Sequence, residues 1–514
     1  MTGSVSRRRA PFAALLSAYA VSVLGTTMSE LAIPWFVLTT TGSAAKTGLV
    51  AFAEMAPYVL AQVLAGPIVD RAGLRRSFVA GNIAAALAVG AIPVMYAAGS
   101  LSFGVLLALV AVAGSVRGAA DCANSALVPA TAAVGQIPLE RAAGLNAGAN
   151  RTALLLGAPL GGALITLTSS TTVVAADAAT FAVAAVVVAV FVRGIRPGTT
   201  ITVDSPPAMA TAAERAPAAP PAVPTPDAVP TPDAGATAAN PIPHQSAPVD
   251  STRSTGSAVR RYGRDLAEGL RFIRGDRLLL GIVTMVAVAN LLDQGMSAVL
   301  LPVWVRRELH SATALGLLGG ALGLGALIGS LAGAWLGPRV PRRALYGFGF
   351  LLGAAPRFFV LLLASSLAPV LVVFFVADTF GGSVNSVIGA TSYERIPPHL
   401  QARVLGMIKA SAYVGIPFGA LVAGFAADTV GLDTTIAVAG VCYLVTTLTP
   451  FVFPAWRDMR RPADAASDAT SAAAADATPT AAVDATPTAA DDAVVSTHDR
   501  VGGSLPLPDP PTRS

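Results

Sequence analysis

GPIVDRAGLRR, residues 66–76, places four charged side chains in eleven positions between two long apolar segments. The four are Asp70, Arg71, Arg75 and Arg76. Part of this pattern returns as GPRVPRR at residues 337–343. A hydrophobic chain that is interrupted twice by similar basic stretches indicates a membrane domain built by duplication.

The composition excludes an ordinary soluble protein. Of the 514 residues, 54% are hydrophobic and only 12% are charged, and the mean hydropathy is +0.65. Runs of about 20 apolar residues can span a bilayer, where only helices and closed barrels satisfy their own backbone hydrogen bonds. The runs here lack the alternation of barrel strands. We therefore predict an all-α membrane protein with twelve transmembrane helices, at residues 12–38, 46–66, 76–98, 101–130, 144–168, 171–192, 278–304, 314–336, 344–365, 367–391, 404–426 and 432–454.

The arginines predict the orientation. With the N-terminus inside, most arginines of the connecting segments fall on the cytoplasmic side, and the opposite loops hold only Lys46, Arg306 and Arg307. An even number of helices then places both termini in the cytoplasm. The Ala- and Arg-rich composition suggests a bacterial source, and thus the inner membrane. This distribution accounts for the net charge of +5 without a nucleic-acid partner.

Two segments rich in Ala, Pro and Thr divide the chain. Neither can bury enough apolar surface to fold, so we predict both to be disordered. The predicted organisation is an N-terminal six-helix bundle (1–195), a cytoplasmic linker (196–257), a short amphipathic helix with a second six-helix bundle (258–461), and a cytoplasmic tail (462–514).

The two halves are similar in sequence. Met28, Pro34 and Gly48 correspond to Met296, Pro302 and Gly316 at a constant offset of 268 residues. Later matches, such as Gly157 with Gly415, have a slightly smaller offset. Such a duplication into two parallel bundles is typical of transporters whose site lies between the repeats.

The opening stretch resembles the signature loop of the major facilitator superfamily, whose pattern is Gly-x-Leu-Ala-Asp-Arg-x-Gly-Arg-Lys. The residues on the pattern are Gly66, Asp70, Arg71, Gly73 and Arg75; Leu74 replaces a basic residue of the pattern, for which Arg76 can compensate. The resemblance implies a cytoplasmic latch that contacts the start of the eleventh helix, near Arg403, when the protein opens outward. The second copy has no acid, so we expect a weaker latch there. The alternative is a solvated basic loop; Asp70, at an unfavourable C-terminal helix end, argues against it.

Further stretches point to one subgroup. MSELAIPW in the first predicted helix and LAEGLRF before the seventh are similar to bacterial efflux proteins that include macrolide-type drug exporters and siderophore exporters. The fifth predicted helix resembles the antiporter signature Gly-Pro-x-x-Gly-Gly. Gly157, Gly161 and Gly162 fit it, and Pro159 comes one place late. The alternative for this motif is ordinary small-residue packing.

Ionisable side chains near the bilayer centre cost at least about 2.5–3.5 kcal/mol each, so they require a role. The candidates for the cavity and for proton coupling are Glu30, Glu54, Arg117, Asp121, Asp293, Arg357 and Asp378. The resemblance implies a cavity lined by the first, fourth, seventh and tenth helices, and each of these carries at least one of the candidates. We expect them to face one shared, wet vestibule between the bundles.

Several roles stay open at this stage. Arg117 and Asp121 are four residues apart and can pair, either as a static neutral pair or as a proton-linked one. Asp293 and Asp378 have no opposite charge one helical turn away, and a carboxyl in an apolar setting takes up protons more readily. We expect Asp293 and Glu30 to carry protons, with structural roles as the alternative.

Two further acids are interpreted separately. Glu54 either binds a proton or bonds to a neighbouring helix. Asp177 is expected to cap the start of the sixth helix at the outer surface.

Other function classes find no support. A phosphate-binding loop needs Gly-Lys, and the only lysines, Lys46 and Lys409, follow Ala45 and Ile408. All four histidines lie outside the predicted spans, so no His-based metal or catalytic site is expected within the membrane. We predict a monomeric, non-enzymatic secondary transporter without a cofactor, which uses the proton gradient to export a small organic molecule. Proton-coupled uptake and a non-transporting membrane sensor are the alternatives.

Overall fold

The computed structural model describes residues 2–192, 267–337, 339–396 and 401–459, and these residues are almost entirely α-helical. The first half contains α1 (Thr2–Thr41), α2 (Ala44–Leu64), α3 (Gly66–Ala72), α4 (Leu74–Ala97), α5 (Phe103–Val134), α6 (Leu139–Leu167) and α7 (Ser170–Phe191). The second half contains α9 (Arg277–Gly295), α10 (Leu301–Glu308), α11 (Ala312–Leu336), α12 (Arg342–Leu363), α13 (Leu367–Arg395), α14 (Gln401–Thr429) and α15 (Leu432–Val452). The predicted linker 196–257 and tail 462–514 lie outside the described residues, so these boundaries stay predictions.

Among the described residues, eleven helical segments are long and apolar enough to cross a membrane. One of them joins α9 and α10 through a π-helical turn at Met296–Leu300. Pro302 accounts for the wider turn, because it has no amide hydrogen to donate to the carbonyl of Ala298. The predicted span 144–168 belongs to α6, which is not among the eleven because Asn150 and Arg151 lower its apolar character.

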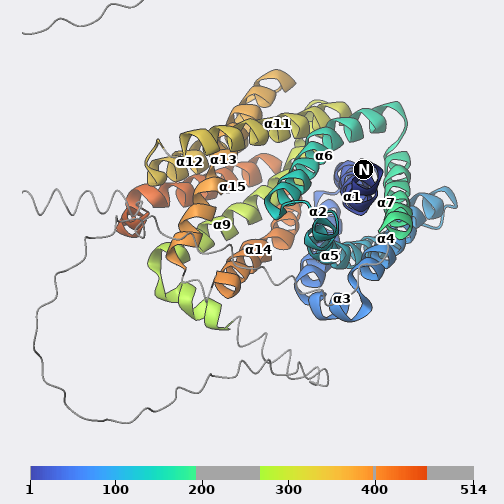
Figure 1. Ribbon diagram of the computed structural model, residues 1–514. Helices are drawn as coiled ribbons and strands as arrows, with labels where there is room; N and C mark the ends of the chain where they lie inside the picture. The colour runs from blue at the N-terminus through green and yellow to red at the C-terminus, as the bar shows by residue number, and fades with distance from the viewer. Residues whose placement is uncertain (1, 193–266, 338, 397–400, 460–514) are drawn as a thin grey trace, which may run out of the picture. The chain divides into compact units, whose positions relative to one another are not determined.

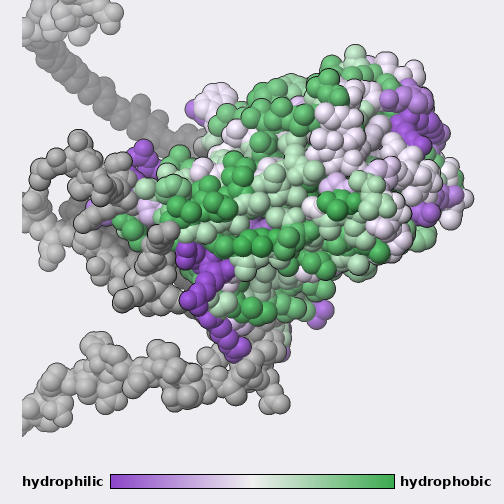
Figure 2. Space-filling model, turned by 90° about the vertical axis from the view of Figure 1, so that its right-hand side faces the viewer, coloured by the Kyte–Doolittle hydropathy of each residue, from purple (hydrophilic) through white to green (hydrophobic). Residues whose placement is uncertain are grey.

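The outside of the molecule suits lipid. Large apolar side chains such as Leu87, Leu331 and Val372 are exposed on α4, α11 and α13. Figure 2 shows one face, where hydrophobic side chains form a broad band and hydrophilic ones gather toward its two sides. A soluble monomer rarely exposes so much apolar surface, so this band is the lipid-facing belt of a membrane protein.

The two halves repeat the same helix packing. In the first half α1 packs on α6, α2 on α5, and α4 on both α5 and α7. In the second half α9 packs on α14, α11 on α13, and α12 on both α13 and α15. Figure 1 shows α1 seen end-on, with α2, α5, α6 and α7 around it. These equivalent pairs confirm the predicted fold class of two pseudo-symmetric six-helix bundles.

The halves meet through two equivalent helix pairs, α2 with α14 and α6 with α11. The α6–α11 crossing is close because it is made by glycines: a Cβ at Gly162 would lie 2.6 Å from the carbonyl oxygen of Ala312 and 2.8 Å from the Cα of Gly316. On the other side, the rings of Phe52 and Phe418 lie 5.6 Å apart. A duplicated chain thus produces a duplicated interface.

The buried core distinguishes the two ends of the molecule. We call the end where α1 stops and α2 begins the outer end, following the predicted orientation, and the opposite one the inner end. At the outer end one continuous cluster joins both halves, from Ile33 and Val50 to Leu301 and Ile436. At the inner end each half has core clusters of its own. The halves are therefore packed together at the outer end.

Candidate coupling site

The first group of charges lies inside the N-terminal half and is centred on Arg117 of α5. Its guanidinium contacts Glu54 Oε1 of α2 at 2.6 Å and Glu30 Oε1 of α1 at 3.4 Å. The side chain of Glu54 is only 10% exposed, whereas that of Glu30 is 39% exposed. Three helices thus contribute one cation and two acids, and Glu30 is the acid open to water.

The predicted pairing of Arg117 with Asp121 is wrong. Asp121 instead accepts a hydrogen bond from the Tyr58 hydroxyl of α2, at 2.9 Å. The guanidinium carbon of Arg117 also lies over the Tyr58 ring, 5.6 Å from the centroid of that ring. Spacing along one helix allowed the pair, but the acids of the neighbouring helices compete for the arginine and are closer.

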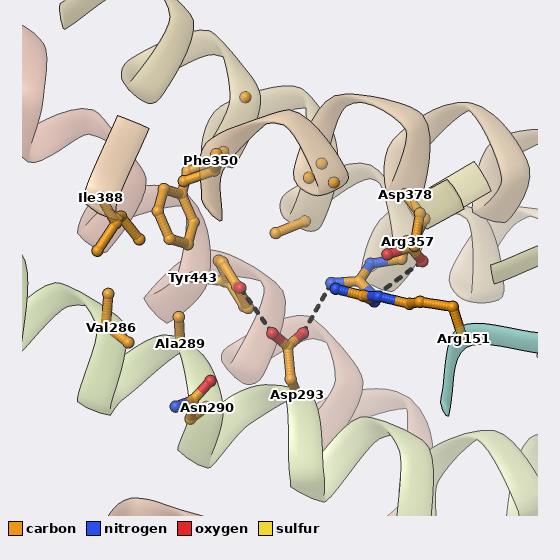
Figure 3. Close-up of a pocket in the computed structure, with 17 residues that line it drawn as sticks. Arg151, Val286, Ala289, Asn290, Asp293, Phe350, Arg357, Asp378, Ile388 and Tyr443 are labelled. Atoms are coloured by element: carbon orange, nitrogen blue, oxygen red, sulfur yellow. Dashed lines mark hydrogen bonds and ion pairs between the residues drawn. The ribbon is translucent and has the colours of Figure 1, made fainter. Parts of the chain in front are cut away.

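The second group lies inside the C-terminal half and is centred on Arg357 of α12 (Figure 3). Its guanidinium contacts Asp293 Oδ1 of α9 at 2.7 Å and Asp378 Oδ2 of α13 at 3.6 Å. The Tyr443 hydroxyl of α15 donates to Asp293 Oδ2 at 3.0 Å. As the sequence indicated, neither aspartate has an opposite charge one turn away on its own helix, and the cation that binds both comes from a third helix.

Each group lines a cavity of its own. The N-terminal cavity, of about 200 Å³, is lined by Glu30, Tyr58, Arg117 and Asp121 among others. The C-terminal cavity, of about 260 Å³, is lined by the Arg357 group. Six of the seven candidates line these two cavities and Glu54 lines neither, and the shared vestibule between the halves stays a prediction.

Arg151 brings a charge of the N-terminal half to the C-terminal cavity. It belongs to α6 of the N-terminal half, yet it lines the C-terminal cavity. Figure 3 shows its side chain directed toward Arg357 and Asp378. Asp378 Oδ2 is buried and accepts no hydrogen bond from the described residues. The C-terminal cavity is thus the place where a charge of one half faces charges of the other.

The signature stretch forms a short helix of its own rather than a loop. α3 covers Gly66–Ala72, and Gly73, with φ of +89°, turns the chain into α4. Asp70, Arg71 and Arg76 are exposed at the inner end. Asp70 forms no ion pair with any other residue that the structure describes, and the side chain of Arg403 lies outside the description. The latch therefore stays a prediction.

Arg75, in contrast, has a packing role. It donates to the carbonyl of Ala189 near the end of α7. Its counterpart Arg343 donates to the carbonyls of Pro450 and Phe451 at the end of α15, at 2.8 and 3.0 Å. Both arginines satisfy carbonyls that a helix C-terminus leaves unpaired. The second copy also gains an acid that the sequence pattern lacked, since Arg342 binds Glu394 of α13 at 2.5 and 2.7 Å.

The residues of the antiporter-like motif all lie at helix crossings. A Cβ at Gly157 or Gly161 would meet Thr27 or Met28 of α1 at 2.7 and 3.1 Å. Gly162 and Pro159 face α11 instead. The small-residue packing alternative accounts for these positions, and a specific antiport role for the motif stays a prediction.

Asp177 does not cap a helix, so that expectation is wrong. Ser169 caps α7, with its side chain accepting from the amide of Thr172, and Asp177 lies two turns further in. The Asp177 side chain is buried, with 3% exposed, and accepts from the Thr180 hydroxyl at 3.2 Å. The first turns of α7 hold several Ser and Thr residues, and the true cap precedes them.

The sequence alone did not identify Tyr58 or Tyr443 as residues of the site. Tyr58 and Tyr443 each donate to a cavity carboxylate, but neither stands in a motif. The only available signal is that a buried tyrosine hydroxyl needs a polar partner, which does not identify that partner.

Comparison with protein families gives a match over most of the chain. The model described as Major Facilitator Superfamily matches residues 15–292 and 283–489.

Several curated relatives match along almost their whole length. The Multidrug efflux pump Tap of Mycobacterium bovis (strain BCG / Pasteur 1173P2) is 26% identical over 457 residues, which cover 88% of this chain and 95% of the relative. The protein of the same name from Mycolicibacterium fortuitum is 24% identical, with 88% and 98% covered.

Solved structures share the fold at low identity. The nucleoside transporter NupG superposes with a TM-score of 0.61 at 9% identity, over 86% of this chain and 99% of that one. A bacterial homologue of the human lysosomal transporter Spinster, in an inward-facing and unoccupied conformation, has a TM-score of 0.59 at 14% identity, over 88% and 98%.

Proposed function

Because the chain belongs to the Major Facilitator Superfamily, we propose that it is a proton-coupled exporter of small organic molecules that works by alternating access. The similarity to the Tap multidrug efflux pumps over 88% of the chain supports export of drug-like compounds. We further propose that the protein acts as a monomer in the bacterial inner membrane, with both termini in the cytoplasm.

The observation that carries the proposal is the repeated cavity group, in which an arginine holds two carboxylates from two other helices. In each half the pair of acids is unequal. Glu30 and Asp293 are 39% and 38% exposed, whereas Glu54 and Asp378 are 10% and 22% exposed. The more exposed acid can exchange protons with water in the cavity, and the less exposed one keeps the arginine neutralised.

Proton coupling follows from competition at these acids. When Glu30 or Asp293 is ionised, it is bound to its arginine and is open to a substrate cation. When the carboxylate takes up a proton, it no longer attracts the arginine or a substrate cation. Proton binding and substrate binding at this acid therefore exclude one another. A carrier that reorients only when loaded with one of the two then exchanges inward protons for outward substrate.

The direction is tested by transport of a fluorescent lipophilic cation in inverted membrane vesicles containing the protein, in which the cytoplasmic face points outward. Export predicts uptake into vesicles that have an acidic interior, and loss of this uptake when the pH gradient is dissipated. The matched controls are Glu30→Gln and Asp293→Asn.

Each alternative gives a different result in the same vesicles. Proton-coupled uptake in cells carries substrate and protons together toward the cytoplasmic face, so it predicts extrusion from preloaded vesicles. A sensor predicts no flux under either condition. Flux that persists unchanged in both single variants and in their combination would contradict the assigned proton carriers while leaving export intact.

A further inference from the structure

Asp428 makes the most extensive hydrogen-bonded contact between the halves in the described chain. It lies in the last turn of α14, and its partners, at the start of α2, are 383 to 385 residues away in sequence. Oδ1 accepts from the amide of Ala44 at 3.0 Å. Oδ2 accepts from the amide of Ala45 at 2.9 Å and from the Ser43 hydroxyl at 2.7 Å.

These bonds use groups that α2 cannot satisfy itself. The first amides of a helix have no hydrogen-bond acceptor within that helix. In α2 the Ser43 hydroxyl oxygen accepts from one of them, the amide of Lys46, at 3.1 Å. Asp428 takes the amides of Ala44 and Ala45. Its charge is unfavourable at the end of its own helix and favourable at the start of another. The carboxylate is therefore well placed only while the two halves touch.

The same helix pair has a second acid at its opposite end. α2 and α14 run antiparallel, because Gly48 lies against Ala420 and Gly424 while Phe52 lies against Phe418. Continued toward the inner end, this register brings Asp70, just after α2, level with the first turn of α14. Asp428 thus lies in the last turn of α14 at the level of the N-terminus of α2, and Asp70, in α3 directly after α2, lies at about the level of the N-terminus of α14.

We propose that Asp428 is the outer latch of the transporter, the counterpart of the inner latch predicted at Asp70. In this structure the outer latch is engaged, and Asp70 has no ion pair with a described residue. Since the halves can close at only one end at a time, the two aspartates hold the two end states in turn. This role rests on the proposed alternating access and adds to it a residue that sets the balance between the states.

The test measures the outer gap directly. Spin labels are placed at Ser100 and Ser365, exposed residues that follow α4 and α12 at the outer end of the two halves. Cys122 and Cys442 are first replaced by alanine. Double electron–electron resonance on protein in lipid nanodiscs then gives the populations of short and long distances. Asp428→Ala is expected to shift the ratio toward the long distance roughly tenfold, the effect of losing a charged helix cap.

The matched control is Asp433→Ala. Asp433 is also an exposed acid at the outer end, but its ion pair, with Arg307 at 2.8 Å, stays within the C-terminal half. This variant is expected to leave the distances unchanged. Asp428→Asn keeps the shape and one acceptor oxygen, so it should shift the ratio in the same direction by less. Unchanged distances in Asp428→Ala and Asp428→Asn, or an equal shift in Asp433→Ala, would overturn the latch.

This measurement needs neither substrate nor a pH gradient, so it is independent of the transport assay. A distance shift without flux in vesicles supports the latch and contradicts the exporter. Flux with unchanged distances supports the exporter and contradicts the latch.

Discussion

The two acids that share Arg117 should respond differently to the same mutation. Glu54 lies 2.6 Å from the guanidinium and is 10% exposed, and Glu30 lies 3.4 Å from it and is 39% exposed. Removing one partner of a buried ion pair costs about 3–5 kcal/mol, because the other charge stays buried without compensation. For Glu54→Gln we expect the lower end, about 3 kcal/mol, since Glu30 still offers Arg117 a partial counter-charge.

Glu30→Gln should be nearly neutral for stability. Its contact is long and open to water, and ion pairs of this kind contribute about 1 kcal/mol or less. The two variants therefore separate structure from coupling. Glu54→Gln is expected to lower the unfolding temperature of the purified protein in detergent by several degrees. Glu30→Gln should keep the wild-type unfolding temperature but lose the dependence of flux on the pH gradient.

The assays are thermal unfolding followed by tryptophan fluorescence, and flux in inverted vesicles at several imposed gradients. Arg117→Lys is a useful third variant, because it keeps the charge and loses the geometry that reaches two acids at once. Equal destabilisation by Glu30→Gln and Glu54→Gln would refute the division of roles. So would normal gradient dependence in Glu30→Gln.

Other predictions follow from single contacts. Gly162→Leu should abolish flux and disturb the α6–α11 crossing, because its side chain would enter the backbone of α11; Gly144→Leu, where a Cβ meets nothing within 4 Å, is the control for both flux and yield of folded protein. Tyr443→Phe should lower the free energy of unfolding by about 1–2 kcal/mol through loss of the bond to Asp293. Tyr346→Phe should be neutral or stabilising, since that buried hydroxyl has no described partner, and similar costs for the two tyrosines would contradict the assignment. Asp70→Asn should slow turnover while leaving substrate binding intact; lost binding with normal turnover of bound substrate would count against the inner latch.

Much of the fold follows from the sequence, because apolar length and helical hydrogen bonding leave few choices in a bilayer. The offset that relates Pro34 to Pro302 also predicted the duplication. The boundaries were less predictable. The π-helical turn before Pro302 and the separate helix within GPIVDRAGLRR depend on local backbone bonding that an apolar run does not encode.

The candidate site was predicted in composition but not in pairing. Glu30, Asp293 and Asp378 were recognised because a charge in an apolar run is costly. Their partners Arg117 and Arg357 come from other helices, and the rotation of those helices is set by packing. The Arg117–Asp121 prediction failed for this reason, since sequence spacing describes neighbours on one helix only. Tyr58 and Tyr443 could not be identified as site residues, because a tyrosine in an apolar run does not interrupt the hydrophobic pattern as a charged residue does.

The hydrogen bond of Arg75 links the end of α7 to the start of α4. This arginine lies four residues after Arg71 and five after Asp70. The long Pro-rich connection between the halves leaves the N-terminal half directly after α7. A displacement of the end of α7 would therefore be passed through Arg75 to the segment next to Asp70, which links the last helix of this half to the predicted inner latch.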